Sequence, residues 1–296
     1  MRFVIARRCS ILLAGLLLLW ASQASDTRAG AQDARDQRAP AVVAPAATSF
    51  FWYSPPLYTN STPQRISTLA FDPATAGFAL AASLNGGDPL QRTTDHGITW
   101  SPLVTFRPNF IFYGSKKQTY YAFANGLYKT SDGGGTWALQ SNSQPINRLW
   151  VHPANSEILY ANNGFDLFRS LDGGKTWTSP ASQCACAPEA FSLAIGTNQP
   201  NVLYAGRFYD RGGGVARSAD QGATWQEASS GLPISDTIES IIQLVADPRD
   251  ANVVFALTET GNIYKTTNGG GQWVPFETGL PADPIHALTM DDKHAY

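Results

Sequence analysis

The sequence is poor in the residues on which metal, thiol and histidine chemistry depend. Its 296 residues include three cysteines, four histidines and two methionines, and only 15% of the residues are charged. The longest apolar run, Ser10–Ala21, has 12 residues, whereas a membrane-spanning helix needs about 20. We therefore expect no metal site, no cofactor and no stable membrane span.

Clusters of basic residues are also missing from most of the chain. The formal net charge is −2, and loss of residues 1–31, which hold four arginines and one aspartate, would change it to −5. Nucleic acids and anionic membranes are bound by concentrated positive charge. The composition thus argues against both as partners.

The amino-terminal part is typical of an exported protein. Arg2, Arg7 and Arg8 precede the apolar run, and small residues follow it at Ser22–Ala24 and Ala29–Ala31. This order is that of a secretory signal peptide, which we place at residues 1–31. An Ala/Pro-rich spacer at residues 32–48 has too little apolar content to pack. We expect the mature protein to be periplasmic or extracellular, with one domain at residues 49–296.

One short motif returns five times in that domain. Each copy has a hydroxyl residue, an acidic residue two positions later, one to three glycines and a closing tryptophan, as in Thr130–Trp137. The last copy has drifted, with Asn268 at the acidic position. The acidic positions are Asp95, Asp132, Asp172, Asp220 and Asn268, and the tryptophans are Trp100, Trp137, Trp177, Trp225 and Trp273. Spacings of 37, 40, 48 and 48 residues between the acidic positions match the length of one four-stranded propeller blade.

The motif has the chemistry of a β-hairpin turn. An alternating run such as Leu127–Lys129 precedes each copy, and alternation that ends in Ser, Asp and Gly indicates a strand entering a hairpin. The aspartate can accept N–H groups within the turn, and glycine permits positive φ. Each motif therefore joins the third and fourth strands of one unit.

A second motif marks where each unit begins, as in Ile66–Pro73, Ile146–Pro153 and Ile242–Pro248. Because proline cannot donate a ladder hydrogen bond, Asp-Pro or His-Pro ends the first strand. Five units are complete between about residues 64 and 281, and a sixth starts at Ile285. We favour a chain that continues beyond Tyr296 to six or seven blades. Alternatively, Ser49–Ser54 supplies outer strands to the unfinished blade.

The repeated motif resembles the Asp-box of BNR-repeat β-propellers over roughly residues 64–296. Such propellers occur in sialidases, xyloglucanase-type glycoside hydrolases, sortilin-like receptors and a photosystem II assembly factor. The resemblance implies an all-β propeller whose Asp-boxes lie on the face away from the ligand. It also implies that the boxes reinforce hairpins. A calcium loop needs several oxygen ligands at alternating positions, whereas each box offers one carboxylate.

The loops on the opposite face are the predicted ligand site. The two longest surround the fourth unit: one runs from Ser179 to Glu189 and the other begins at Arg207. Charged and aromatic side chains there suit an anionic or sugar-like ligand; the candidates are Arg207, Tyr209, Asp210, Arg211 and Glu189. Cys184 and Cys186 lie in the first loop, and in an oxidising compartment they are candidates for a disulfide.

Two functions remain open from the sequence. We identify no catalytic residues, because the arginine cluster of sialidases is absent and no carboxylate pair suited to glycoside hydrolysis stands out. The favoured function is therefore a secreted, non-catalytic propeller that binds a protein or a glycan. The alternative is an extracellular glycoside hydrolase of the xyloglucanase or exo-sialidase type, with Asp210 and Glu189 as conceivable carboxylates.

Overall fold

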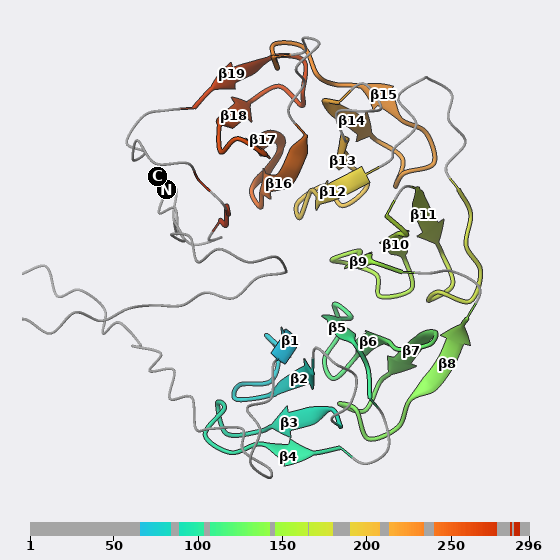
Figure 1. Ribbon diagram of the computed structural model, residues 1–296. Coiled ribbons are helices and arrows are strands. Elements are labelled where there is room, and N and C mark those ends of the chain that lie inside the picture. Colours follow the sequence, from blue (N-terminus) through green and yellow to red (C-terminus); the bar gives the residue numbers. More distant parts are fainter. Residues whose placement is uncertain are drawn as a thin grey trace, which may run out of the picture.

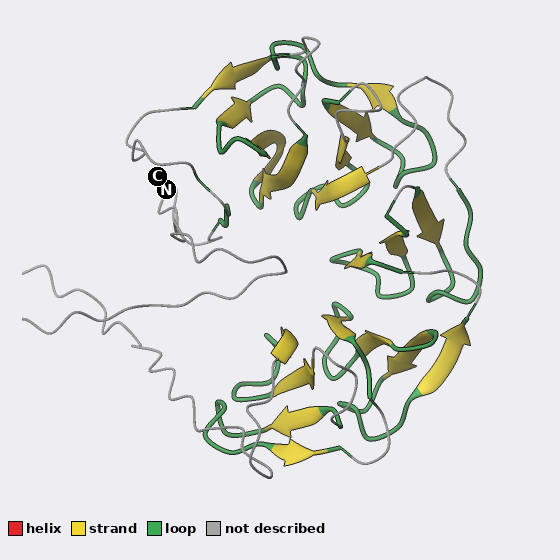
Figure 2. Ribbon diagram, viewed as in Figure 1, coloured by secondary structure: helices red, strands yellow, loops and turns green. Residues whose placement is uncertain are grey.

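The described part of the chain is built entirely from β-strands. A computed structural model describes residues 66–83, 89–103, 107–142, 146–164, 166–179, 190–207, 213–233, 240–276, 285 and 287–290. These residues form 19 strands and no helix, arranged as five sheets around a common centre (Figures 1 and 2). The predicted all-β propeller is confirmed. Within the described residues, no helix is present that could cross a membrane.

Each sheet is an antiparallel blade whose strands follow the chain order from the centre outwards (Figure 1). The first blade has β1 (Ile66–Phe71), β2 (Ala79–Ser83), β3 (Gln91–Thr93) and β4 (Ser101–Pro102), and the second has β5 (Phe110–Tyr113), β6 (Tyr120–Phe123), β7 (Leu127–Thr130) and β8 (Ala138–Ser141). The third has β9 (Arg148–Val151), β10 (Leu159–Asn162) and β11 (Leu167–Ser170), the fourth β12 (Ala190–Ile195), β13 (Leu203–Arg207), β14 (Val215–Ser218) and β15 (Gln226–Glu227), and the fifth β16 (Ile241–Asp247), β17 (Asp250–Thr258), β18 (Ile263–Thr266) and β19 (Trp273–Pro275). The five predicted blades are thus present and in the predicted order.

The third blade departs from the four-strand pattern. Its sheet has three strands, and the outer segment contributes a single bridge between Arg169 and Thr178. Both backbone bonds of this pair are made, at 2.8 and 2.9 Å. Pro180 follows two residues later, and a proline cannot donate to a ladder. Within the described residues, which end at Ser179 here, the fourth strand of this blade is represented by this single pair.

The core lies between neighbouring blades rather than within any one of them. Successive side chains of a strand point to opposite faces of its sheet, and the second strands use both faces. Leu159 packs towards the second blade and Tyr160 towards the fourth, and Leu203 and Tyr204 repeat this division one blade later. All four are 0% exposed. Blade-on-blade packing therefore holds the propeller together.

The described residues near the carboxyl end occupy the place of another first strand. Ile285 and Leu288 are buried against the fifth blade, and the Leu288 backbone exchanges hydrogen bonds of 2.8 and 2.7 Å with the Gln243 side chain. Thr68 accepts the Ile111 N–H in the same way between the first two blades. The packing thus agrees with a sixth blade that begins at Ile285.

Several predicted features lie outside the described residues. They are the signal peptide (1–31), the spacer (32–48), the aromatic segment Ser49–Ser54 and the cysteine pair, Cys184 and Cys186.

Candidate functional site

The Asp-box carboxylates are occupied within their own turns. In the second blade, Asp132 Oδ1 accepts hydrogen bonds from Thr130 Oγ1 at 2.6 Å and from Thr136 N at 2.9 Å. Its Oδ2 accepts one from Thr136 Oγ1 at 2.7 Å. The same pattern recurs at Asp95, Asp172 and Asp220. In the drifted copy, Asn268 Oδ1 still accepts from Thr266 Oγ1 and Gln272 N.

These hydrogen bonds lower the pKa values of the box carboxylates. The Thr130 hydroxyl and then the Thr136 N–H lower the pKa of Asp132 to about 2. At Asp172, burial raises the pKa, but the hydrogen bonds led by the Thr176 hydroxyl outweigh it and lower the pKa to about 2. A general acid in glycoside hydrolysis needs a raised pKa instead. The geometry favours a role in the turn over a role in catalysis.

The backbone of each box fixes a second turn of the same blade. Two consecutive residues of every box have positive φ, for example 70° at Gly133 and 89° at Gly134. The first of them donates its N–H to the turn between the first and second strands, as Gly173 does to Glu157 O at 2.8 Å. The equivalent bond occurs in all five blades, although in the fifth its acceptor, Asn252 O, lies near the start of β17. Both kinds of turn therefore lie on one side, which we call the Asp-box face.

Two box glycines differ in what surrounds them. A Cβ built on Gly174, at φ 88°, would collide with the Leu127 side chain of the preceding blade. A Cβ on Gly97, at φ 84°, would lie 3.8 Å from its nearest neighbour, the Trp100 ring. Positive φ therefore favours glycine at both positions, and the close approach of Leu127 requires it in addition at Gly174.

The box tryptophans close the hairpins with one exception. In the first four copies the indole Nε1 donates to the carbonyl of the glycine that is the second positive-φ residue of the box, at 3.0 to 3.2 Å. In the fifth copy, Trp273 Nε1 donates instead to Ala228 O of the fourth blade, at 2.7 Å. Trp273 is 1% exposed and belongs to the core between these blades. The drifted box has exchanged a contact inside its own turn for one between blades.

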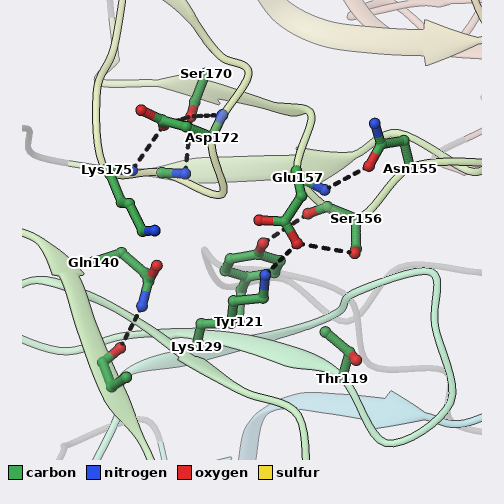
Figure 3. A network of polar contacts seen from close by, with 12 residues as sticks. Thr119, Tyr121, Lys129, Gln140, Asn155, Ser156, Glu157, Ser170, Asp172 and Lys175 are labelled. Atoms are coloured by element: carbon green, nitrogen blue, oxygen red, sulfur yellow. Dashed lines mark hydrogen bonds and ion pairs between the residues drawn. The ribbon is translucent and has the colours of Figure 1, made fainter.

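Polar side chains on the Asp-box face connect the second and third blades (Figure 3). The Tyr121 hydroxyl donates to Ser156 O at 2.6 Å, and Lys129 forms an ion pair with Glu157. The hydrogen bond from Lys129 lowers the pKa of Glu157. Glu157 also belongs to the turn that the third box holds. These charged groups are therefore paired within the protein.

On the opposite face, the structure describes one of the five predicted ligand residues. Arg207 ends β13, is 5% exposed and donates through Nη2 to both carboxylate oxygens of Glu227, at 2.8 and 2.7 Å. The buried Arg207 guanidinium is therefore paired with a half-exposed carboxylate of the same blade. Tyr209, Asp210, Arg211 and Glu189 lie outside the described residues, so their role stays a prediction.

A cavity that the sequence interpretation missed lies where the inner strands of blades one to four converge. Its volume is about 610 Å³, and its wall includes Leu69, Phe71, Tyr113, Trp150, Ile195 and Thr197. Phe71, Tyr113 and Ile195 end their strands directly before the turns of the Asp-box face, and Pro153 and Thr197 lie in such turns. The cavity is therefore at the Asp-box end of the central channel. Alignment of the strand ends in the repeat could have indicated this ring of large apolar residues.

The described residues offer no candidate metal centre. They contain no group of three or more His, Cys, Asp and Glu side chains close enough to hold an ion.

Comparison with known proteins agrees with this architecture. A family profile described as BNR/Asp-box repeat matches residues 91–102, the first box. A xyloglucanase from Paenibacillus sp. is 25% identical over 274 residues, covering 75% of this chain and 26% of its own length. A xyloglucanase from Hypocrea jecorina is 24% identical over 217 residues, covering 68% of this chain and 24% of its own length.

Solved structures share the fold at lower identity. The GH74 xyloglucanase from Xanthomonas campestris matches with a TM-score of 0.56 and 18% identity, covering 72% of this chain and 38% of that one. YCF48 bound to D1 peptide matches with a TM-score of 0.55 and 18% identity, covering 74% of this chain and 70% of that one.

The blades and their repeated turns define a β-propeller with Asp-boxes. The chain is a β-propeller whose first box matches the BNR/Asp-box repeat profile; it is similar in sequence to xyloglucanases and in fold to a GH74 xyloglucanase and YCF48. It spans about a quarter of the length of the curated relatives that it matches.

Proposed function

We propose that this chain is an exported, non-catalytic propeller that binds a glycan of the xyloglucan type. The observation that carries the proposal is the alignment with a xyloglucanase, which runs through 75% of this chain. The composition agrees, because a mildly acidic chain without basic clusters suits a neutral polysaccharide better than a nucleic acid. The amino-terminal sequence supports export.

The distribution of carboxylates supports binding over hydrolysis. Hydrolysis of a glycosidic bond needs two carboxyl groups facing each other across the substrate, about 5–10 Å apart. Among the described acidic residues, those of the boxes accept hydrogen bonds within their turns, Glu157 is paired with Lys129, and Glu227 with Arg207. The residues that line the cavity include no carboxylate.

A glycoside hydrolase is the second candidate function. The curated relatives are named as xyloglucanases, and this chain spans about a quarter of their length. In this case Asp210 and Glu189, on the loops of the fourth blade, are the residues to test. A further outcome is a protein ligand, which the similarity to YCF48 bound to D1 peptide supports.

One experiment separates these functions. The full chain is titrated with xyloglucan oligosaccharides by calorimetry, and the release of reducing ends is followed on xyloglucan. We expect binding without release. Release that is lost in Asp210→Ala or Glu189→Ala would establish the hydrolase, whereas no binding to any saccharide would refute a glycan-binding function.

A further inference from the structure

A buried histidine lies where the turns of the third and fourth blades meet on the Asp-box face. His152 directly follows β9, precedes Pro153 and is 3% exposed. Its Nδ1 accepts the Ala154 N–H at 3.3 Å, so the neutral ring carries its proton on Nε2. Among the described residues, Nε2 has no hydrogen-bond partner. The ring therefore holds its own turn while it keeps an unpaired N–H group buried.

The equivalent residue of the first blade shows what a side chain at this position does. Asp72 also precedes a proline, and its Oδ1 accepts the Ala74 N–H at 2.8 Å. Its Oδ2 accepts the Gln118 N–H, in the turn of the second blade, at 2.9 Å. The side chain thus joins the turn of its own blade to that of the next. His152 is placed in the same way, because the Pro200 carbonyl in the β12–β13 turn of the fourth blade acts on its ring.

The surroundings of His152 disfavour its charged form. Burial lowers the pKa of the imidazole below its usual value of 6.5, and the Pro200 carbonyl offsets this only in part. The turn of the fourth blade, residues 196–202, contains no charged residue. A buried imidazolium without a counter-ion is costly, so the ring is neutral at pH 7.

The charged groups of the neighbouring elements are engaged elsewhere. Glu157, in the same turn, forms its ion pair with the second blade. Asp172, in the box that holds this turn, accepts hydrogen bonds within that box. Arg169, on β11, donates to Gln221 O of the fourth blade at 3.2 Å. None of these groups is among the causes of the pKa shift of His152.

Protonation changes what the ring can bind. An imidazolium donates from both nitrogens, so Nδ1 can no longer accept the Ala154 N–H, and a positive charge is left buried between the blades. We propose that His152 is a pH-sensitive lock: while neutral it holds the β9–β10 turn against the fourth blade, and once protonated it releases this turn and opens the interface between the two blades at the Asp-box end. The cavity wall changes with it, because Val151, Pro153 and Thr197 line the cavity beside this interface.

The direction of the pH dependence follows from proton uptake. Opening exposes the ring to water and returns its pKa towards 6.5, so the open form binds the proton more readily than the closed form. Opening is therefore independent of pH well above 6.5 and becomes more favourable as the pH falls below this value, by at most about tenfold per pH unit for one proton. The carboxylates of Asp132 and Asp172, with pKa values of about 2, stay ionised over this range.

The test measures amide hydrogen exchange of the full chain by NMR between about pH 5 and pH 8. The reporters are the amides of Ala154 and Ile158, whose N–H groups are bonded within the turn of His152. Their protection, corrected for the intrinsic effect of pH, should fall by up to about tenfold per pH unit below about pH 6.5. The Phe78 amide is the internal control, because it lies in the equivalent turn of the first blade, where Asp72 stays ionised.

Two variants isolate the ring. His152→Asn supplies an oxygen that can accept the Ala154 N–H, as Asp72 does in its own turn, but it does not titrate, so it should remove the pH dependence. His96→Asn is the matched control, since His96 is exposed at a φ of 63°, which asparagine tolerates. It should leave the pH dependence unchanged. In the unaltered protein, NMR titration of the His152 ring should give a pKa below 6.5.

Three results would overturn the lock: a His152 ring that titrates at or above 6.5, protection of Ala154 and Ile158 that does not change with pH, or a pH dependence that persists in His152→Asn. An equal loss of protection at Phe78 would show that the propeller opens as a whole, and it would overturn the assignment to this interface.

Discussion

Replacing the aspartate of one Asp-box by alanine should destabilise the propeller, whereas asparagine should largely preserve its stability. Asp132 accepts three hydrogen bonds, at 2.6, 2.9 and 2.7 Å. One intramolecular hydrogen bond contributes about 0.5–1.5 kcal/mol to stability. Because the turn is exposed and water competes for these donors, the lower part of the range applies. We expect Asp132→Ala to lower the free energy of unfolding by about 2 kcal/mol.

The asparagine variant is the matched control, because the chain already contains it at Asn268. That amide oxygen accepts the Thr266 hydroxyl at 2.9 Å and the Gln272 N–H at 2.9 Å. Asp132→Asn can keep both corresponding bonds and loses the one made by Oδ2, so we expect a loss below about 1 kcal/mol.

The assay is urea unfolding followed by tryptophan fluorescence, with the midpoint and slope compared among the three proteins. Equal destabilisation by alanine and asparagine would refute the hydrogen-bond explanation. So would an alanine variant within about 0.5 kcal/mol of the parent, since surface substitutions commonly fall in that range.

Three other outcomes follow from the same structure. Acid should destabilise the protein as the pH falls from about 4 to about 2, because a box carboxylate whose pKa is lowered from 3.8 to about 2 stabilises the fold only while it is ionised. When the free energy of unfolding is measured against pH, Asp172→Asn should reduce the slope in this range. In urea unfolding, Gly174→Ala should lower the free energy of unfolding by at least about 2 kcal/mol and Gly97→Ala by only about 1 kcal/mol. Both variants place alanine at positive φ, but only the alanine at position 174 collides with a neighbouring blade. Equal losses would contradict this explanation. Arg207→Met should cost no more than about 1 kcal/mol of stability, because the Glu227 side chain is half exposed and water replaces its partner, and a double-mutant cycle with Glu227→Gln should show the coupling.

The sequence was sufficient for the fold because its strongest signals are local. A hairpin turn is specified by its own hydroxyl, acidic and glycine residues, as in Thr130–Trp137, and five such turns at blade spacing define the propeller. The single described pair at Thr178 was not predicted, because the repeat predicts a fourth strand in every blade. The drift at Asn268 was visible in the sequence, but the transfer of the Trp273 indole to Ala228 depends on contacts between blades.

The candidate site was harder to predict from the sequence, because its contacts join residues that are far apart along the chain. Arg207 was grouped with the residues beside it in the chain, whereas in the structure it pairs with Glu227, 20 positions away and on another strand. The cavity residues Phe71, Tyr113 and Trp150 belong to three different blades. They lie close together because the blades are arranged around one axis, and no local sequence pattern predicts that arrangement.

The Asp-box face therefore has a larger part in the molecule than reinforcement of its hairpins. The first four boxes each donate a backbone N–H to the turn that follows the innermost strand of their blade, and the fifth donates one to Asn252 O near the start of β17. Those turns border the cavity in the third and fourth blades, where Pro153 and Thr197 lie. A blade whose box drifts, as the fifth has at Asn268, is also one whose inner strand contributes no residue to the cavity lining.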